Sequence, residues 1–154
     1  ICFTSPLTRA RQTAQCVLGD REIPVIEDKR IQEIDFGVLE GTQFKDAQGK
    51  IVSREMEIFF EDPLNFKRPE NGENISDILK RTREFWIEKT TDPALADKTV
   101  LVSSHGCAVR ALLQNIYQDP AHFWHGCVPP NCSINLVEVK DGKIRLLEED
   151  KVYS

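Results

Sequence analysis

The sequence predicts an α/β fold in which helices flank a largely parallel sheet with an antiparallel edge. Two features indicate this class. Short apolar runs alternate with segments whose apolar residues recur every three or four positions, as strands and helices do in βα units. Near the C-terminal end, Asp141-Gly142 separates residues 133–139 from residues 143–147, and this dipeptide is a strong signal for a hairpin between two strands.

The first predicted unit is a strand over residues 1–4 that leads into a helix. Ser5-Pro6 is a helix-start signature, with Ser5 as the N-cap and Pro6 at the first helical position. A second short strand is predicted over residues 23–26. Between these strands, one apolar stripe follows a helix that ends near Gly19: Leu7, Ala10, Ala14, Val17 and Leu18.

The middle of the chain is predicted to hold loops and short helices. Residues 30–41 mix polar and apolar side chains with two glycines, which is typical of a shaped loop. Residues 42–74 carry weak helical signals that Pro63 and Pro69 interrupt. We therefore expect a helical insertion there, which forms a lid above the sheet.

Regular structure is predicted again from residue 74. Asn74 or Ser76 could cap a helix that ends near Asp92-Pro93. Residues 99–102 form a continuous apolar run of the kind found in strands buried on both faces. A second helical stripe follows that run: Val109, Leu112, Leu113 and Ile116.

The composition is that of one globular domain over residues 1–154. A net charge of −5 and a pI near 5.3 argue against nucleic acid or an anionic membrane as a partner, so any phosphate must be held by a few placed cations. Five cysteines without paired spacing are typical of reduced thiols in the cytoplasm. No apolar run approaches the roughly 20 residues of a membrane helix, and we expect a soluble protein.

Two candidate residues follow the predicted strands, where open α/β sheets bind their ligands. Arg9 lies one turn into the first helix, and His105 begins the helix after residues 99–102. Helix starts favour anions, so a cation such as Arg9 is poorly placed there unless an anion binds beside it. Gly106 would let backbone and ligand approach closely. The alternatives are a surface arginine and a histidine that only begins a helix; Arg11, on another face, is expected to be exposed.

Glu33 is a candidate proton donor. Apolar residues flank it on both sides, and desolvation in such a setting raises the pKa of a carboxyl so that it can hold a proton near neutral pH. Asp35 is the competing candidate, and spacing alone does not separate the two.

Two other kinds of chemistry find less support. His122, His125 and Cys127 lie close in sequence, but zinc sites need three or four ligands at recognisable spacing, and an aromatic turn near the pocket rim is the better interpretation. No metal is therefore expected. Cysteine-based phosphatases need an arginine six positions after the cysteine, which none of the five cysteines has. Cys107 is expected to be a small buried residue.

Three ordered segments resemble signatures of the histidine phosphatase superfamily, the phosphoglycerate-mutase-like enzymes: residues 4–14, residues 33–41 and Ser104-His105-Gly106. With Gly72-Glu73-Asn74 and residues 130–134, the similarity covers nearly the whole chain, although relatives often have serine in place of Asn74. The resemblance implies a three-layer sandwich whose phosphate pocket lies at the strand ends.

The resemblance also implies roles for the candidate residues. Arg9, His105 and Gly106 would bind the phosphoryl group, Glu33 and His105 would be catalytic, and Glu33 would serve as general acid and then base, with no cofactor. The attacking histidine of relatives lies in an Arg-His-Gly motif at the end of the first strand, and this triplet does not occur here. We therefore expect a chain that lacks the first strand of the fold, begins inside a longer polypeptide and is inactive alone.

The implied activity is hydrolysis of a small phosphomonoester through a phosphohistidine. Mutases of the family follow the glutamate with Arg-His-Tyr-Gly, whereas Ile34-Asp35-Phe36-Gly37 stands here, which favours a phosphatase. A cofactor-dependent phosphoglycerate mutase and a non-catalytic phosphate-binding domain are the alternatives. A missing strand would leave open sheet edges, so the chain could pair with a second copy as a homodimer.

Overall fold

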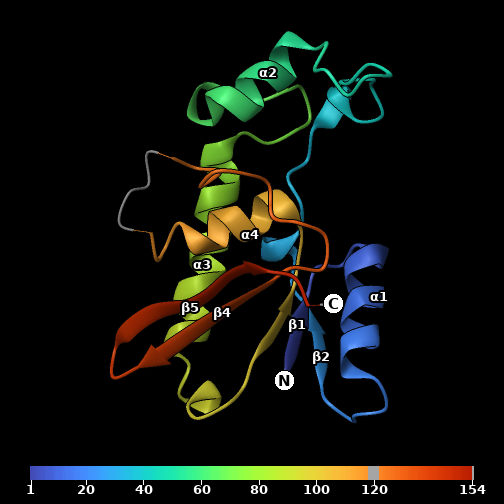
Figure 1. Ribbon diagram of the computed structural model, residues 1–154. Helices are drawn as coiled ribbons and strands as arrows, with labels where there is room; N and C mark the ends of the chain where they lie inside the picture. The colour runs from blue at the N-terminus through green and yellow to red at the C-terminus, as the bar shows by residue number, and fades with distance from the viewer. Residues whose placement is uncertain (118–121, 154) are drawn as a thin grey trace.

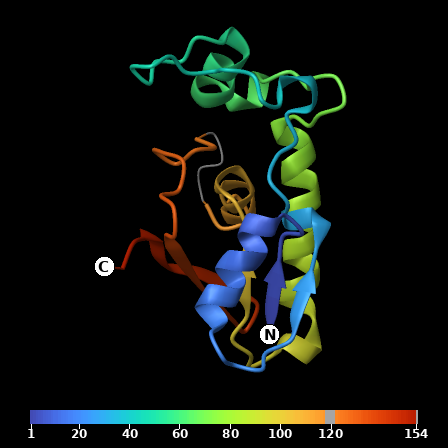
Figure 2. The same cartoon turned by 90° about the vertical axis from the view of Figure 1, so that its right-hand side faces the viewer.

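The computed structural model describes residues 1–117 and 122–153, and in them three short strands form a parallel sheet (Figure 1). The strands are β1 (Cys2–Thr4), β2 (Val25–Glu27) and β3 (Leu101–Ser103), in the order β2-β1-β3. Helix α1 (Thr8–Leu18) covers one face, and α3 (Ile75–Thr91) and α4 (Gly106–Leu113) cover the other (Figure 2). The predicted α/β sandwich around a parallel sheet is confirmed.

The central strand β1 shows why helices occupy both faces. Neighbouring residues of a strand point to opposite sides of the sheet. Cys2 packs with Ala14 and Leu18 of α1, whereas Phe3 packs on the other face, with its ring 5.7 Å from that of Phe85 in α3. Because both sides of β1 are buried, the polar residues that follow it are held at a fixed edge of the sheet.

The predicted start of the first helix is wrong. Helix α1 begins at Thr8, with Leu7 as an N-cap that makes no side-chain capping bond. Ser5 Oγ accepts a hydrogen bond from the N–H of Leu7 at 3.3 Å, but it also lies 2.8 Å from His105 Nε2. Its hydroxyl therefore contacts a residue on another element, and the helix starts two residues later than predicted.

Strand β3 differs from the prediction of a strand buried on both faces. Val102 is 38% exposed, although it pairs in register with the buried Phe3 of β1. In the part of the chain that the structure describes, β3 is an edge strand of the three-stranded sheet, so one side of it has no neighbouring strand. Strand β2, at the opposite edge, also exposes its apolar residues and begins two residues later than predicted, at Val25.

The stretch over residues 42–74 contains α2 (Arg54–Glu61) and a 3₁₀ turn, η3 (Pro63–Asn65), and α2 lies beyond the N-terminal end of α3 (Figure 1). Phe59 of α2 anchors this stretch. Its ring lies 5.1 Å from the rings of Phe36, Phe66 and Trp124, and its carbonyl accepts a hydrogen bond from Trp124 Nε1 at 3.0 Å. The insertion is thus packed on the loop after Glu33; its role as a lid stays a prediction.

Replacing Phe59 with alanine is expected to lower the free energy of unfolding by about 3 to 5 kcal/mol, because it leaves a cavity in this aromatic cluster. Phe59 is only 3% exposed. Phe44, in the same insertion, is 38% exposed, so Phe44→Ala serves as a matched control with a much smaller loss. Denaturant unfolding of both variants measures the difference, and equal losses would contradict the role of Phe59 as the anchor.

The C-terminal hairpin consists of β4 (Ile134–Lys140) and β5 (Lys143–Lys151). Asp141 and Gly142 both have positive φ, 51° and 72°, so the predicted hairpin turn is confirmed. The hairpin forms its own two-stranded sheet in the described residues, not the expected edge of the parallel sheet. Arg110 of α4 links it to the fold through Glu149, Asp150 and the carbonyl of Cys127.

Arg110 is fully buried, which the predicted apolar stripe of its helix did not indicate. Its guanidinium also donates to the hydroxyl of Tyr117 at 3.0 Å. A buried cation needs such partners, since burial without them is costly.

None of the described helices combines the length and hydropathy that a membrane crossing requires.

Candidate active site

Arg9 and His105 are in direct contact, although 96 positions separate them. Helices α1 and α4 follow neighbouring parallel strands, so their first turns meet at the same edge of the sheet. Arg9 Nε donates to His105 Nδ1 at 3.1 Å, and His105 is 9% exposed. The predicted meeting of the guanidinium and the imidazole is therefore present in the structure.

These contacts assign the proton of the His105 ring. Nδ1 accepts from Arg9, so in the neutral ring the proton lies on Nε2, which donates to Ser5 Oγ at 2.8 Å. Burial, together with the charges of Arg9 and Arg81, lowers the pKa of His105 to about 4. At neutral pH the imidazole is uncharged and presents an Nε2–H donor.

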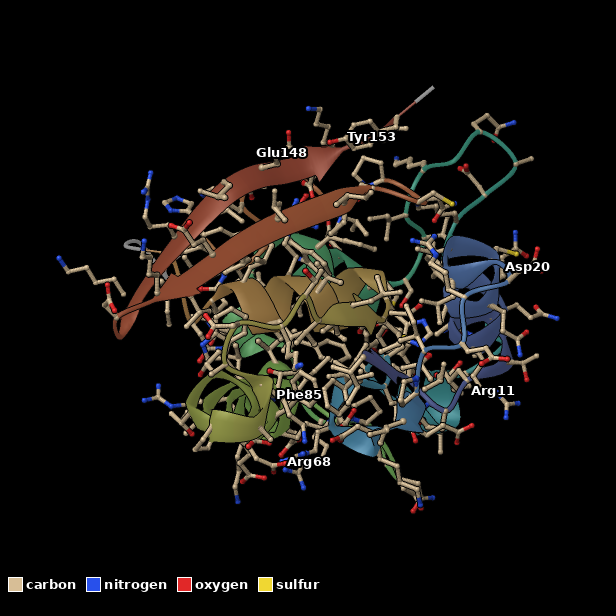
Figure 3. The ribbon with its side chains drawn as sticks, turned by 90° about the horizontal axis from the view of Figure 1, so that it is seen from below. Arg11, Asp20, Arg68, Phe85, Glu148 and Tyr153 are labelled. Carbon is tan, nitrogen blue, oxygen red and sulfur yellow. The ribbon has the colours of Figure 1, made fainter. Side chains whose placement is uncertain are left out.

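The contact with His105 leaves part of the Arg9 guanidinium available for other partners. Only Nε is used, and neither Nη atom has a hydrogen-bonding partner within residues 1–117 and 122–153. Arg11, two residues later, lies on the outer side of α1 and pairs with Glu27 at 3.1 Å (Figure 3). Its exposure agrees with the prediction. Arg9 is thus the arginine of this helix whose free N–H groups lie beside His105.

Glu33 lies against the start of α4. Its carboxylate accepts the N–H groups of Cys107 at 3.3 Å and Ala108 at 3.1 Å, and that of Ile34 at 3.1 Å. Burial raises the pKa of Glu33, against the opposing effects of these hydrogen bonds and of the Arg9 charge. A carboxyl that is held here and protonates more readily than usual is suited to proton transfer.

The position of Glu33 limits where a phosphate could bind. Helix starts favour anions, and at the first turn of α4 the anion is the Glu33 carboxylate, which occupies the N–H groups of Cys107 and Ala108 that a phosphate would otherwise use. Negative groups are stabilised at a helix start, which explains why a side chain of the protein takes this place. An anion at this edge would therefore rely on Arg9 and His105.

Gly106 allows close packing at the same point. A Cβ on Gly106 would lie 2.8 Å from Val128 Cγ1 and 4.0 Å from Glu33 Oε2. The structure thus gives the glycine a packing reason that the sequence did not indicate, and its predicted contact with phosphate stays a prediction.

Asp35 does not share the setting of Glu33. Its Oδ1 accepts the N–H of Gly37 at 2.8 Å in an exposed turn. Gly37 has a φ of +53°, and a Cβ there would lie 2.2 Å from the carbonyl oxygen of Glu70. Asp35 therefore shapes the tight turn after the loop, and the geometry favours Glu33 as the carboxyl of the site.

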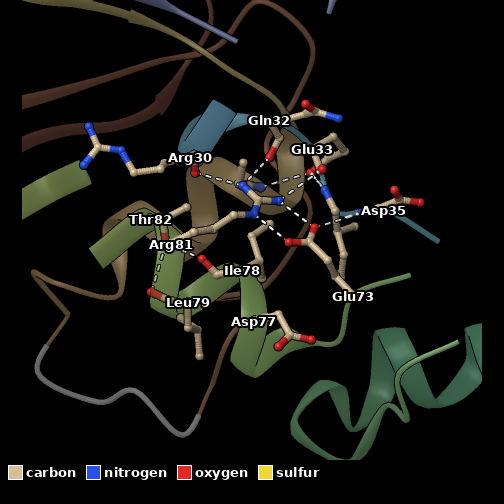
Figure 4. A network of polar contacts seen from close by, with 12 residues as sticks. Arg30, Gln32, Glu33, Asp35, Glu73, Asp77, Ile78, Leu79, Arg81 and Thr82 are labelled. Atoms are coloured by element: carbon tan, nitrogen blue, oxygen red, sulfur yellow. Dashed lines mark hydrogen bonds and ion pairs between the residues drawn. The ribbon is translucent and has the colours of Figure 1, made fainter. Parts of the chain in front are cut away.

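Sequence reasoning missed an ion pair behind Glu33, formed by Arg81 of α3 and Glu73 (Figure 4). Both residues line a depression of about 260 Å³ that also includes Glu33. Arg81 falls beside the apolar stripe of α3, next to the buried Thr82, and a cation in that position is the one signal that could have found it.

Asn74, whose role the resemblance left open, caps α3 in a reciprocal pair with Asp77.

The histidine and cysteine candidates have other partners. His125 stacks on Tyr117 and lies 2.7 Å from Glu149 Oε1, and the carbonyl of Cys127 binds Arg110. Among the described residues, no group of three or more His, Cys, Asp or Glu side chains could hold a metal ion. Burial raises the pKa of the Cys107 thiol well above its usual value, so it remains protonated.

The pKa of His105 predicts a pH-dependent stability. Between about pH 4 and 6.5 the unfolded chain binds a proton at this histidine and the folded chain does not, so stability is lost as the pH falls through that window. The loss expected between pH 7.5 and 4.5 is about 2 kcal/mol, because this range covers only part of the pKa difference and solvent screens the ring in part. Denaturant unfolding of the wild type and of His105→Gln at pH 7.5 and 4.5 measures it. The variant should lose less stability on acidification; parallel losses would contradict the assignment.

Comparisons with known proteins point to one family. A family model described as the histidine phosphatase superfamily (branch 1) matches residues 1–150. A 2,3-bisphosphoglycerate-dependent phosphoglycerate mutase of Methylobacterium sp. is 32% identical over an alignment of 119 residues, and the match covers 73% of this chain and 55% of the mutase. A probable 2-carboxy-D-arabinitol-1-phosphatase of Arabidopsis thaliana is 29% identical over 142 residues, 90% of this chain and 28% of that protein.

A solved structure shares the arrangement of the elements. Bacillus stearothermophilus YhfR superposes with a TM-score of 0.84 at 27% identity, over 99% of this chain and 74% of that one. The chain spans about half the length of the curated mutases that it matches.

Proposed function

The chain belongs to the histidine phosphatase superfamily (branch 1), and from this premise we propose that the protein containing it hydrolyses a small phosphomonoester through a phosphohistidine. The observation that carries the proposal is the contact between Arg9 and His105, with the carboxylate of Glu33 bound to the first turn of α4, the helix that His105 precedes. This arrangement combines two donors for a phosphoryl group with a carboxyl that can carry a proton. The nucleophilic histidine belongs, in this proposal, to a segment outside the present sequence.

In the first half of the reaction, the nucleophilic histidine attacks phosphorus in line with the leaving oxygen. The free Nη groups of Arg9 and the Nε2–H of His105 offset charge on the nonbridging oxygens, with the His105 donor turning from Ser5 to the phosphoryl group. Glu33 donates its proton to the leaving alcohol. The P–O bond breaks as the P–N bond forms.

In the second half, water attacks the phosphorus of the phosphohistidine, so that a P–O bond forms as the P–N bond breaks and inorganic phosphate is released. Glu33, now ionised, removes a proton from the water, so the carboxyl ends the cycle protonated as it began. Loss of its proton to the alcohol leaves a carboxylate that the N–H groups of Cys107 and Ala108 stabilise. Burial favours the protonated carboxyl that acts as the acid, whereas the hydrogen bonds at the start of α4 stabilise the carboxylate that acts as the base.

A phosphatase is favoured over a mutase by the residues after Glu33. Where mutases place Arg-His-Tyr, the side chain of Ile34 is buried in the core and that of Asp35 binds a turn. Neither adds a cation for the second acidic group of a phosphoglycerate. The mutase alternative draws on a specific observation, the 32% identity to a curated mutase, so it is tested beside the phosphatase.

The experiment uses the full-length protein and a panel of phosphomonoesters that includes sugar phosphates, nucleotides and phosphoglycerates. We expect release of inorganic phosphate, and mass spectrometry during turnover should detect phosphate on a histidine. Exchange between phosphoglycerate isomers without net phosphate release would establish the mutase instead. Binding of phosphate without turnover or histidine labelling would establish a non-catalytic domain.

A further inference from the structure

All the hydrogen bonds of Arg81 go to Glu73 and to the backbone of the loop that carries Glu33 (Figure 4). A guanidinium has five N–H donors, and Arg81 makes five hydrogen bonds. Nε and Nη2 form a bidentate pair with the Glu73 carboxylate at 2.7 and 2.8 Å. The other three bonds reach the backbone carbonyls of Arg30 (2.8 Å), Gln32 (2.7 Å) and Glu33 (3.1 Å).

These carbonyls need a partner because of the local backbone. A short 3₁₀ helix, η1 (Lys29–Ile31), ends at Ile31, and the chain becomes extended at its C-cap, Gln32. Carbonyls at a helix end have no partner within the helix, and a cation satisfies them best. The side chain of Arg81 is only 17% exposed, so the guanidinium replaces water as their donor.

Glu73 fixes the loop on the other side of Glu33. Its Oε2 accepts the N–H of Asp35 at 3.1 Å, and its own N–H donates to the carbonyl of Asp35 at 2.7 Å. The backbone is thus held immediately before, at and after Glu33. On its opposite side, the Glu33 carboxyl meets the N–H groups of α4.

We propose that Arg81, oriented by Glu73, is a positioning residue that fixes the Glu33 carboxyl for proton transfer. The inference rests on the proposed role of Glu33 as general acid and base. Arg81 does not bind the substrate, because its donors are all used within the protein. It acts through the backbone of the loop, and a misplacement of about 1 Å in such a group costs about 100-fold in rate.

The kinetic test uses Arg81→Met and Arg81→Lys in the full-length protein, with an alkyl phosphate as substrate. We expect kcat/KM to fall about 100-fold with methionine. Lysine should not restore it, since one ammonium cannot form the bidentate pair and reach three carbonyls. The alkaline limb of the pH profile should move to lower pH, because a loosened Glu33 gains water and loses the burial that raises its pKa. Arg83→Met, exposed on the same helix, is the control and should change neither value.

A second readout needs no turnover. The amide protons of Cys107 and Ala108 bind the Glu33 carboxyl, so NMR can follow its titration and their exchange with solvent. We expect faster exchange and a lower titration midpoint in the Arg81 variants. If the wild type hydrolyses no phosphomonoester, the proposed function fails, and the NMR result alone still decides the positioning role.

If the methionine variant does not fold, the Arg81→Lys variant tests the positioning role of Arg81. A lysine variant with wild-type amide exchange at residues 107 and 108 and a wild-type titration of Glu33 would overturn the proposal. So would a variant that is less stable but keeps the wild-type pH profile, because that result describes a purely structural arginine.

Discussion

Replacement of Arg9 by methionine is expected to lower kcat/KM of the full-length enzyme by about 10²- to 10³-fold, as the loss of one preorganised donor to a transition state does elsewhere. Methionine fills a similar volume but has no N–H donors. The variant loses the free Nη groups and the bond to His105 Nδ1 at the same time. Initial-rate kinetics with a phosphomonoester substrate measure the effect.

A second consequence of this substitution does not depend on turnover. The Arg9 charge is one cause of the low pKa of His105, so its removal should raise that pKa from about 4 toward the ordinary 6.5. An NMR titration of the ring measures the shift. Arg11→Met is the matched control, because Arg11 lies on the same helix and pairs with Glu27 at the surface. Equal kinetic losses in the two variants would show that Arg9 has no special role.

Much of the fold could be predicted because its signals are local. The stripe along α3 and the capping residue Asn74 lie within the helix that they define, and the hairpin turn needs only Asp141 and Gly142. The start of α1 could not be predicted in the same way. The Ser5 hydroxyl is engaged by His105, 100 positions away, and periodicity contains no information about that contact.

The site was predictable in part for the same reason. Arg9 and His105 follow strands, and parallel strands end at one edge, so their meeting follows from the topology. Glu33 and Asp35 could not be separated, because their difference depends on the path of an irregular loop. That path is set by Arg81, which is brought beside the loop only when α3 packs on it. The position of Arg81 beside the apolar stripe of α3 is the one trace in the sequence, and it does not indicate which loop the guanidinium binds.

Replacement of Glu33 by glutamine is expected to lower kcat/KM for an alkyl phosphate by about 10²- to 10⁴-fold, the usual contribution of general acid catalysis. Glutamine keeps one oxygen, which can accept the N–H groups of Ile34 and Ala108 as Oε1 of Glu33 does, so most of the contact with the start of α4 remains, and only the N–H of Cys107, bound to Oε2, loses its acceptor. It cannot supply a proton to an alkoxide. Wild-type activity toward alkyl esters should fall as the pH rises through the raised pKa of Glu33, and this alkaline limb should be absent from the variant.

The leaving group separates the two roles of Glu33. With an activated aryl phosphate, the departing phenolate needs no proton, so the first step should survive in Glu33→Gln while attack of water on the phosphohistidine slows. We therefore expect a burst of one phenolate per site followed by slow turnover, measured by stopped-flow absorbance. Asp35→Asn is the matched control, since Asp35 binds the N–H of Gly37 in an exposed turn. If Asp35→Asn shows the burst and Glu33→Gln does not, the proton is carried by the other carboxyl, and the bonds of Glu33 to α4 serve the fold alone.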